Sequence, residues 1–467
     1  MRMLLVSTYE LGHQPLHVAS PAAALRASGH DVRCLDLSVQ PWDAAAVEWA
    51  DAIAFSVPMH TAMRLAVQAA EMIRAHRPDL PICLYGLYAP VSRDATVGRA
   101  VDQVFAGEYE PALISWAARL DHGASPADPS APLIHLGRGR ASFARPARDL
   151  LPPLEHYARL ADRGGERLVG YVEATHGCAH RCRHCPVPTV YDGAFRVVDE
   201  AVVGDDIAQL VQMGATHITF GDPDFLNGPA HALRVVRAMH ERFPHLTFDC
   251  TVKVEHILAH DGIWPEMARA GCRFAVSAIE CLNDRILALL AKGHTADQAA
   301  GAVKTLRRAG IEPRPSFMPF TPWTTISDVV DVLDFVLAHD LVANVDPVQY
   351  SIRLLLPEGS LLLDVAELEP HLGPYDAERL SYQWTPADPR TDALQVEIAA
   401  LAERFAATGE AIRDAFLAID GAVRAAAGRP PMDPASLGDC ENRPRLTEPW
   451  FCCAEPTTGQ LQPIGRL

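Results

Sequence analysis

The stretch Cys178-Ala-His-Arg-Cys182-Arg-His-Cys185 places three cysteines within eight residues, separated by gaps of three and two. It follows Thr175-His176-Gly177, at the end of an apolar run over 170–175 that predicts a buried strand. Thiolates are the usual ligands of iron–sulfur clusters, so three on one tight loop can bind three irons of a four-iron cluster. The fourth iron would stay open to an external ligand.

A zinc ion is the main alternative ligand for this loop. Structural zinc sites close with four protein ligands, and His176, His180 or His184 could complete a set of three cysteines and one histidine. The open cluster is favoured because catalytic groups of parallel barrels follow the carboxyl ends of strands. Both interpretations stay open at this point.

Strand and helix patterns alternate on both sides of the loop. The apolar runs predict parallel strands at 170–175, 217–220, 247–252, 274–279, 311–318 and 347–355. Helical patterns separate them, at 199–213, 229–243, 264–270, 283–309 and 325–338. Six such βα units predict a partial or closed parallel (β/α)6 barrel with its chemistry at the carboxyl ends of the strands.

The first 120 residues form a separate alternation. Strands are predicted at 3–6, 32–37, 52–57, 82–88 and 101–106, with helices between them, notably at 15–28 and 62–76. This pattern predicts a flavodoxin-like, doubly wound α/β domain. Its ligand-binding edge would comprise 9–17, 58–61, 86–88 and 107–108, because ligands of this fold sit outside the carboxyl ends of the strands.

The chain of 467 residues is long enough for roughly three domains. We predict a doubly wound domain over 1–120, a Pro-rich linker over 121–167, the barrel over 168–365 and a C-terminal region over 366–467. That last region contains helical patterns at 391–407 and 410–427 and ends in a tail with adjacent cysteines.

Composition excludes several functional classes. Lys and Arg total 41 against 58 Asp and Glu, a net charge of −17, so no nucleic-acid partner is expected. No apolar stretch approaches the ~20 residues that cross a bilayer, and the first residues are too soon interrupted by polar ones to form a signal peptide. Eleven cysteines without an export signal predict a reducing, cytoplasmic location.

The cysteine loop and the βα units after it resemble the radical S-adenosylmethionine (SAM) superfamily, over roughly 168–365. The resemblance implies that Cys178, Cys182 and Cys185 bind a [4Fe-4S] cluster whose open iron chelates SAM. An electron from the cluster would cleave a C–S bond of SAM and yield a deoxyadenosyl radical. The implied partners are a small-molecule substrate and an external electron donor of the flavodoxin or ferredoxin type, with no membrane.

The same resemblance implies further cofactor contacts. His184 takes the position near the adenine, Gly221 and Asp222 the segment beside the SAM amino group, and Ser277 and Glu280 the positions facing the ribose or carboxylate. A helix cap is the alternative for Asp222.

Arg353 could pair with a carboxylate of SAM or substrate, and a structural salt bridge is equally compatible. The Lys292-Gly-His-Thr295 turn also resembles the family. Helix capping and packing are expected of it, with Lys292 as a candidate charge partner.

The N-terminal domain resembles the cobalamin-binding-like domain found ahead of many radical SAM cores. Many cobalamin proteins carry Asp-x-His-x-x-Gly after the first strand, where this chain has Glu10-Leu-Gly-His13-Gln-Pro15. The different spacing argues against a histidine-ligated cobalamin. Cobalamin without a protein ligand and a sheet that only covers the barrel mouth both stay open.

The tail contains Trp450-Phe-Cys452-Cys453-Ala-Glu-Pro456 and resembles the CUAEP/CCAEP-tail radical SAM (seleno)protein group. Selenocysteine replaces one cysteine in some members of that group, which implies a reactive position. We predict that Cys452 and Cys453 donate a hydrogen atom or electron, form a redox-active vicinal disulfide, or bind a soft electrophile. Two idle thiols are the alternative.

Together these patterns predict a radical SAM enzyme acting on a small molecule between the barrel mouth and the N-terminal domain. One alternative is a cobalamin-assisted methyl or carbon-fragment transferase, including one that acts on a soft element held by the tail. A non-catalytic iron–sulfur or zinc redox sensor is the alternative from another class.

Overall fold

The computed structural model describes residues 1–137, 143–437, 443–448 and 461. Its N-terminal part contains a six-stranded parallel sheet in the order β2-β1-β3-β4-β5-β6. This order confirms the flavodoxin-like prediction. The strands are β1 (Arg2–Ser7), β2 (Asp31–Asp36), β3 (Ala52–Ser56), β4 (Ile82–Tyr85), β5 (Gln103–Gly107) and β6 (Ile134–His135).

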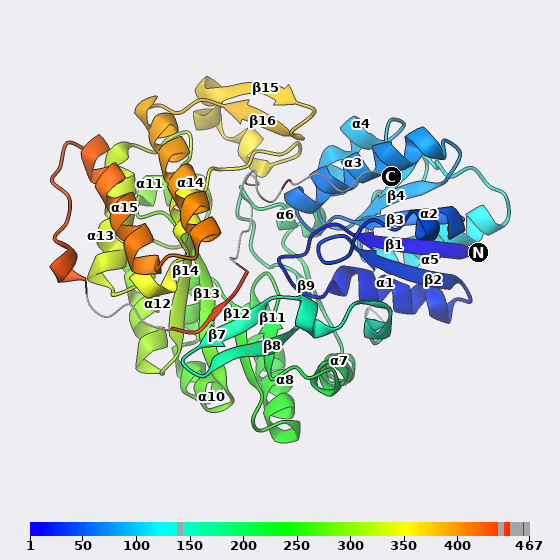
Figure 1. The fold of residues 1–467 in the computed structure, drawn as a ribbon, viewed down its shortest axis with the longest axis horizontal. Helices are drawn as coiled ribbons and strands as arrows, with labels where there is room; N and C mark the ends of the chain where they lie inside the picture. Colours follow the sequence, from blue (N-terminus) through cyan, green and yellow to red (C-terminus); the bar gives the residue numbers. More distant parts are fainter. Residues whose placement is uncertain (138–142, 438–442, 449–460, 462–467) are drawn as a thin grey trace.

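Helices cover both faces of this sheet (Figure 1). Alternate residues of β1 explain why, since successive side chains of a strand point to opposite faces. Met3 and Leu5 belong to a core with α1 and α5, whereas Leu4 and Val6 belong to a second core with α2 and α3. The helices are α1 (Leu16–Ala27), α2 (Ala44–Trp49), α3 (His60–His76), α4 (Arg93–Thr96) and α5 (Tyr109–Asp121).

The second sheet has the order β14-β13-β12-β11-β8-β7-β17. Five strands are parallel: β8 (Gly165–Val172), β11 (His217–Phe220), β12 (Thr247–Thr251), β13 (Cys272–Glu280) and β14 (Glu312–Phe317). The antiparallel strands β7 (Arg159–Asp162) and β17 (Arg445–Leu446) extend one edge. The sheet curls into a half-barrel (Figure 1), as the predicted partial barrel requires.

The helices packed around the half-barrel follow the predicted positions, except that one predicted helix is split and α9 was not predicted. They are α7 (Glu200–Gln212), α8 (Pro229–Arg242), α9 (Val254–Ala259), α10 (Trp264–Arg269), α11 (Asp284–Leu289), α12 (Ala296–Arg308) and α13 (Ile326–Ala338). The single helix predicted over 283–309 is two helices. A capping box of Thr295 with Gln298 starts α12, and the turn before it places Ala291 and Gly293 at positive φ.

The sixth predicted strand, 347–355, is wrong. Pro347–Ser351 forms a 3-10 helix, and Arg353 makes only an isolated bridge with Phe320. Proline cannot donate to a β-ladder, and the side-chain oxygen of Gln349 accepts from the Phe317 amide of β14 at 3.1 Å. The Phe317 amide of β14 therefore donates to a side chain and not to a neighbouring strand.

The segment predicted as a linker joins the two sheets more closely than expected, since β6 pairs with the first sheet and β7 with the second. Arg148 lies between them and is 1% exposed. Its guanidinium pairs with Asp206 of α7 at 2.9 Å and donates to the carbonyl oxygens of Gln14 at 3.1 Å and Tyr171 at 2.6 Å. One buried cation thus ties the N-terminal domain to the half-barrel.

The C-terminal region contains a hairpin of β15 (Leu372–Asp376) and β16 (Ser381–Trp384), followed by the predicted helices, α14 (Arg390–Thr408) and α15 (Ile412–Ala426). The chain then returns to the half-barrel as β17 (Figure 1). Within the described ranges, no helix is both long and apolar enough to cross a membrane.

Candidate active site

A cavity of about 310 Å³ lies between the carboxyl ends of the strands of the two sheets. The loops after β1, β3, β4 and β5 line one side, with residues from 10–17, 58–61, 86–88 and 107. This confirms the ligand-binding edge predicted for the N-terminal domain. Loops after β8, β11, β12 and β13 line the other side and contain most of the predicted site residues.

The cysteine loop starts from a short antiparallel pair, β9 (Thr175–Gly177) with β10 (Phe195–Val197), and α6 (Val187–Tyr191) follows it. Gly177 has a φ of +80°, and a Cβ there would lie 2.6 Å from the ring of Tyr191. Only glycine fits this turn. From it the chain leads into Cys178, Cys182 and Cys185, all of which line the cavity.

The spacing of the three thiols argues against a single zinc ion. Thiolates bound to one zinc at about 2.3 Å lie about 3.8 Å from one another. Among the described residues, the three cysteine sulfurs do not all fall within 4.8 Å of each other. A four-iron cluster binds each thiolate at a different iron and needs wider spacing. The donor set therefore fits a cluster.

Two cysteines of the loop, Cys178 and Cys182, are buried, whereas Cys185 is half-buried. Burial raises the pKa of Cys178 to about 12, so this thiol is protonated until a metal displaces the proton. Burial also raises the pKa of Cys182, although the nearby Lys292 and Lys253 partly oppose this. Asn227 fixes the start of the loop, because its side-chain oxygen accepts from the Ala179 amide at 3.0 Å.

Glu280 forms a buried ionic cluster next to the third cysteine. It accepts from Lys292 Nζ at 3.0 Å and lies 3.1 Å from His184 Nε2. All three side chains are buried and line the cavity. Burial alone would raise the pKa of Glu280, but Lys292 and His184 hold it well below its usual value. Burial alone would lower the pKa of Lys292, and Glu280 raises it instead.

The backbone at Glu280 is strained. Its φ is +69°, and the β13–β14 register shifts between Ala278 and Glu280. Left-handed backbone at a residue other than glycine costs free energy and persists where surrounding contacts impose it. The two ionic contacts of the carboxylate supply that constraint.

Gly221 and Asp222 lie on the cavity wall at the end of β11. A Cβ on Gly221 would come within 2.0 Å of the Tyr171 ring, so glycine is needed here. Both carboxylate oxygens of Asp222 accept hydrogen bonds from the protein, one from Thr175 Oγ1 at 2.6 Å and one from the Ala174 amide at 3.0 Å. Burial raises its pKa to about 7. These bonds hold the start of the cysteine loop against β11.

The structure does not bring Ser277 and Arg353 to the cavity. Val276 and Ala278 line it, and side chains alternate along a strand, so Ser277 points to the other face of β13. Arg353 forms an ion pair with Asp392, stacks 3.5 Å from the Trp384 ring and does not line the cavity. The structural salt bridge is therefore the better interpretation of Arg353.

Sequence reasoning missed Glu173, the buried acid that ends the strand before the loop. Its carboxylate lies 3.2 Å from His17 Nε2 and 3.3 Å from His176 Nε2, and accepts from Tyr171 Oη at 2.9 Å. An acid directly after the apolar run 168–172 was the available indication. Glu173 therefore connects the start of α1 in the N-terminal domain with β9, which precedes the cysteine loop.

The pKa values of the N-terminal residues near Glu173 are strongly shifted. Burial would lower the pKa of His17, yet Glu173 and Glu10 raise it to about 9. Burial raises the pKa of Glu10 to about 7, and it lowers that of His13 to about 4 with help from Arg148. His13 is therefore neutral at pH 7, while His17 carries a proton.

The described part of the tail lies against the cavity. Leu446 of β17 packs beside the core of Leu160, Val169, Phe274 and Val276. Glu448 lines the cavity and accepts from Tyr9 Oη at 2.6 Å. Cys452 and Cys453 lie outside the described residues.

Comparisons with known proteins agree with this architecture. A model of the radical SAM superfamily matches residues 172–336, and a model of the B12 binding domain matches residues 2–115. The chain therefore contains a radical SAM domain and a B12-binding domain. A radical SAM domain implies an enzyme with a [4Fe-4S] cluster and SAM as cofactors.

Solved structures share the fold of both domains. The cobalamin-dependent SAM radical enzyme OxsB, with aqua-cobalamin and SAM bound, superposes with a TM-score of 0.68 at 15% identity, covering 86% of this chain and 66% of OxsB. The radical SAM methyltransferase TsrM from Kitasatospora setae, with cobalamin and a [4Fe-4S] cluster bound, gives 0.65 at 17% identity, covering 93% and 89%.

Curated relatives match over only about half of their length. A tRNA-2-methylthio-N(6)-dimethylallyladenosine synthase of Aliivibrio fischeri (strain MJ11) is 24% identical over 250 residues, covering 50% of this radical SAM chain and 51% of the relative. An uncharacterized methyltransferase of Pyrococcus horikoshii is 24% identical over 222 residues, covering 47% and 46%. The chain thus spans about half the length of the curated relatives it matches.

Proposed function

We propose that this enzyme cleaves SAM reductively and starts radical chemistry on a small molecule held between its two domains. One observation carries the proposal. The cysteine loop, the Glu280–Lys292 pair and the strand ends of the B12-binding domain line the same cavity. A substrate in that cavity would contact the groups of both domains at once.

Cys178, Cys182 and Cys185 would hold the cluster, which supplies, when bound, the electron that cleaves a C–S bond of SAM. The protein's part is to bind and orient. Glu280 stays ionised because Lys292 and His184 face it, so it can accept hydrogen bonds from a ribose or an ammonium group. Because Glu280, Lys292 and His184 are buried, water is excluded from them, which strengthens each of these contacts.

A cobalamin-assisted transfer of a methyl group or carbon fragment is the second candidate. It is favoured by the strand ends of the B12-binding domain, where Gly86 (φ +119°) and Gly107 (φ +78°) leave the cavity edge without side chains. His17 would not ligate cobalt, because Nδ1 lies 2.9 Å from Tyr109 Oη and Nε2 faces Glu173. We propose that cobalamin, where bound, has no histidine ligand from the protein.

The substrate we propose is a small molecule, not a nucleic acid. The names of several curated relatives refer to tRNA, but those proteins match only half of their length here. A net charge of −17 disfavours contact with a phosphate backbone. We further propose an electron donor of the flavodoxin or ferredoxin type. We also propose a cytoplasmic location, because a chain with eleven cysteines, three of them on the cluster loop, fits a reducing compartment.

We propose that the paired cysteines of the tail act at this cavity. Glu448 is fixed on the cavity wall through Tyr9. Cys452 is four residues further on, so its Cα can lie at most about 14 Å from that of Glu448. Chain length alone therefore keeps Cys452 and Cys453 within reach of the substrate, as a redox pair or as a holder of a soft group.

Anaerobic reconstitution tests the proposal. Iron and sulfide are counted, then SAM and dithionite are added with and without hydroxocobalamin, and the products are identified by mass spectrometry. We expect a four-iron cluster and deoxyadenosine. S-adenosylhomocysteine or a methylated product that needs hydroxocobalamin would select the transferase. A fully loaded cluster that never cleaves SAM would contradict both candidates.

A further inference from the structure

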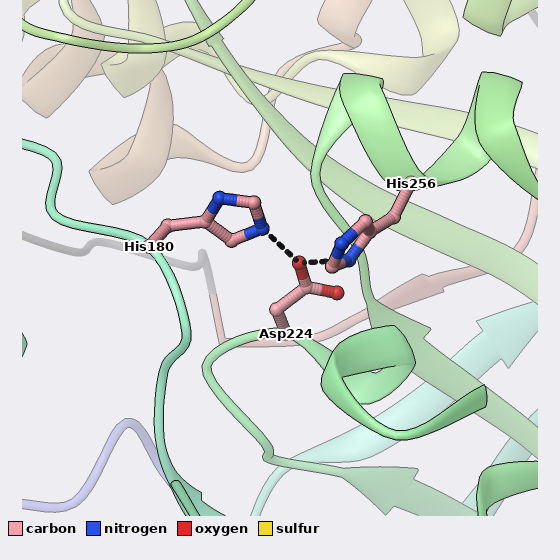
Figure 2. Close-up of side chains that lie close together, drawn as sticks. All are labelled: His180, Asp224 and His256. Atoms are coloured by element: carbon pink, nitrogen blue, oxygen red, sulfur yellow. Dashed lines mark ion pairs between the residues drawn. The ribbon is translucent and has the colours of Figure 1, made fainter. Parts of the chain in front are cut away.

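A second group of ligand-type side chains lies beside the cysteine loop. His180 comes from that loop, Asp224 from the segment after β11, and His256 from α9. Figure 2 shows one carboxylate oxygen of Asp224 pointing at both rings. Among the residues that the structure describes, this group alone brings three histidine, cysteine or carboxylate ligand atoms within 4.8 Å of one another.

The ligand atoms of His180, Asp224 and His256 face one another without forming a normal hydrogen-bond network. Asp224 Oδ2 lies 2.7 Å from His256 Nδ1 and 3.6 Å from His180 Nε2, yet none of the three atoms makes a hydrogen bond of normal geometry. Asp224 is fully buried. A buried carboxylate oxygen that has ion-pair contacts but no well-formed hydrogen bond is costly. Its other oxygen is used normally, accepting from the Leu226 amide at 3.1 Å.

We propose that His180 Nε2, Asp224 Oδ2 and His256 Nδ1 bind a divalent first-row transition-metal ion. Imidazole and carboxylate are ligands that such ions prefer. Two ligands at about 2.1 Å from one ion lie about 3.0 Å apart at a right angle and about 3.4 Å apart at a tetrahedral angle. The distances from Asp224 Oδ2, 2.7 and 3.6 Å, bracket these values.

The neighbouring side chains support a metal on this side of His180. Glu255 Oε2 lies 3.7 Å from Nδ1 of the His180 ring. Metal-binding histidines commonly direct their second nitrogen at a carboxylate, which fixes the tautomer and leaves the first nitrogen free to bind. Lys253 Nζ, 3.6 Å from Glu255 Oε2, balances the charge of that carboxylate.

The ion would join two loops and helix α9 at the edge of the cluster site. His180 is two residues from each of Cys178 and Cys182. Asn227, in the turn that Asp224 starts, already accepts from Ala179. A metal bound to three segments in the folded state alone stabilises that state. The site uses no cysteine, so it is distinct from the cluster and independent of the function proposed above.

Mn²⁺ is the best probe, because it prefers nitrogen and oxygen ligands and is not captured by thiols. The full chain carrying its oxidised, diamagnetic cluster is titrated with Mn²⁺, and free Mn²⁺ is followed by electron paramagnetic resonance (EPR). We expect one bound equivalent in the wild type and in His245→Ala, an exposed control. Asp224→Asn and His256→Gln should lose it while keeping their cluster iron.

Asp224→Asn retains an oxygen that can accept from Leu226, so it preserves the turn while removing the charge. Thermal unfolding without metal checks that each variant is folded, and Mn²⁺ should raise the midpoint only in the wild type and His245→Ala. No Mn²⁺ binding by the wild type would overturn the proposal. Equal binding by the wild type and both site variants would overturn it too, since the ion would then bind elsewhere.

Discussion

Lys292 Nζ lies 3.0 Å from Glu280 Oε1, and both side chains are buried beside the cysteine loop. The contact joins the turn before α12 to the strained end of β13. It therefore fixes one carboxylate and one ammonium group on the wall of the cavity that the two domains share.

Removing one partner of this pair should be more harmful than removing both. Lys292→Met leaves Glu280 buried with only His184 facing it, and such a loss typically costs about 3 to 5 kcal/mol. Lys292→Met combined with Glu280→Gln should recover part of this loss. Urea unfolding compares Lys292→Met, Glu280→Gln and the double variant, with Lys304→Met, on an exposed lysine, as the control. Additive losses in the double variant would contradict a direct pairing.

The proton on His17 should report the contact between the domains. Because Glu173 and Glu10 raise its pKa to about 9, the charged pair stabilises the fold below pH ~6.5, and this contribution is lost as the pH rises through about 9. NMR titration of histidine-labelled protein should locate this midpoint, and Glu173→Gln should lower it. Glu166→Gln, on an exposed residue of β8, should not. An unchanged midpoint in Glu173→Gln would rule out the contact.

Gly221 and Gly204 offer a matched pair for testing the cavity wall. Gly221→Ala would place a Cβ 2.0 Å from the Tyr171 ring, whereas Gly204→Ala, within α7, meets nothing within 4 Å. We expect the first to destabilise the enzyme by about 1 to 3 kcal/mol, as overpacking does, and the second to be neutral or stabilising by up to about 1 kcal/mol. Thermal unfolding compares them. Equal melting temperatures would mean that Tyr171 moves freely.

The tail cysteines should separate substrate turnover from SAM cleavage. Cys452→Ala and Cys453→Ala should leave uncoupled formation of deoxyadenosine largely unchanged and abolish turnover of the true substrate. Cys34→Ala, on β2 of the N-terminal sheet, is the control. Product analysis by mass spectrometry follows both reactions. Normal product yield in both tail variants would show that these thiols are idle.

Local sequence patterns were enough to predict most of the fold. The buried parallel strands are short apolar runs bounded by glycines or prolines, so β1 to β5, β8 and β11 to β14 were predicted in their order along the chain. The edge strands β6, β7 and β17 were not predicted, because they are short and only partly buried. The prediction of the sixth strand was wrong because the hydrophobic pattern does not decide the pairing of β14. Pro347 starts a 3-10 helix, and Gln349 accepts the hydrogen bond that a strand would otherwise take. Similarly, the split of 283–309 depended on the Thr295 capping box, which is visible in the sequence.

The candidate site was predictable where residues are close in sequence. The cysteine loop and its neighbour His184 needed no tertiary information. Ser277 could have been excluded by strand alternation, since on a regular strand it cannot share a face with Glu280, three residues further on. The contacts of Glu173 with His17 and of Asp224 with His256 form only when the segments after β8 and β11 meet helices α1 and α9 in space. Such contacts leave no local pattern in a single chain.

The account rests on one cavity serving both cofactor domains, and spin coupling tests this directly. The enzyme is loaded with cluster and cobalamin and reduced so that the cluster and cob(II)alamin are both paramagnetic, and EPR spectra are recorded at several temperatures. Each centre should broaden or relax the signal of the other, because both would face the same 310 Å³ cavity. Two independent spectra, identical to those of the singly loaded enzymes, would contradict the account.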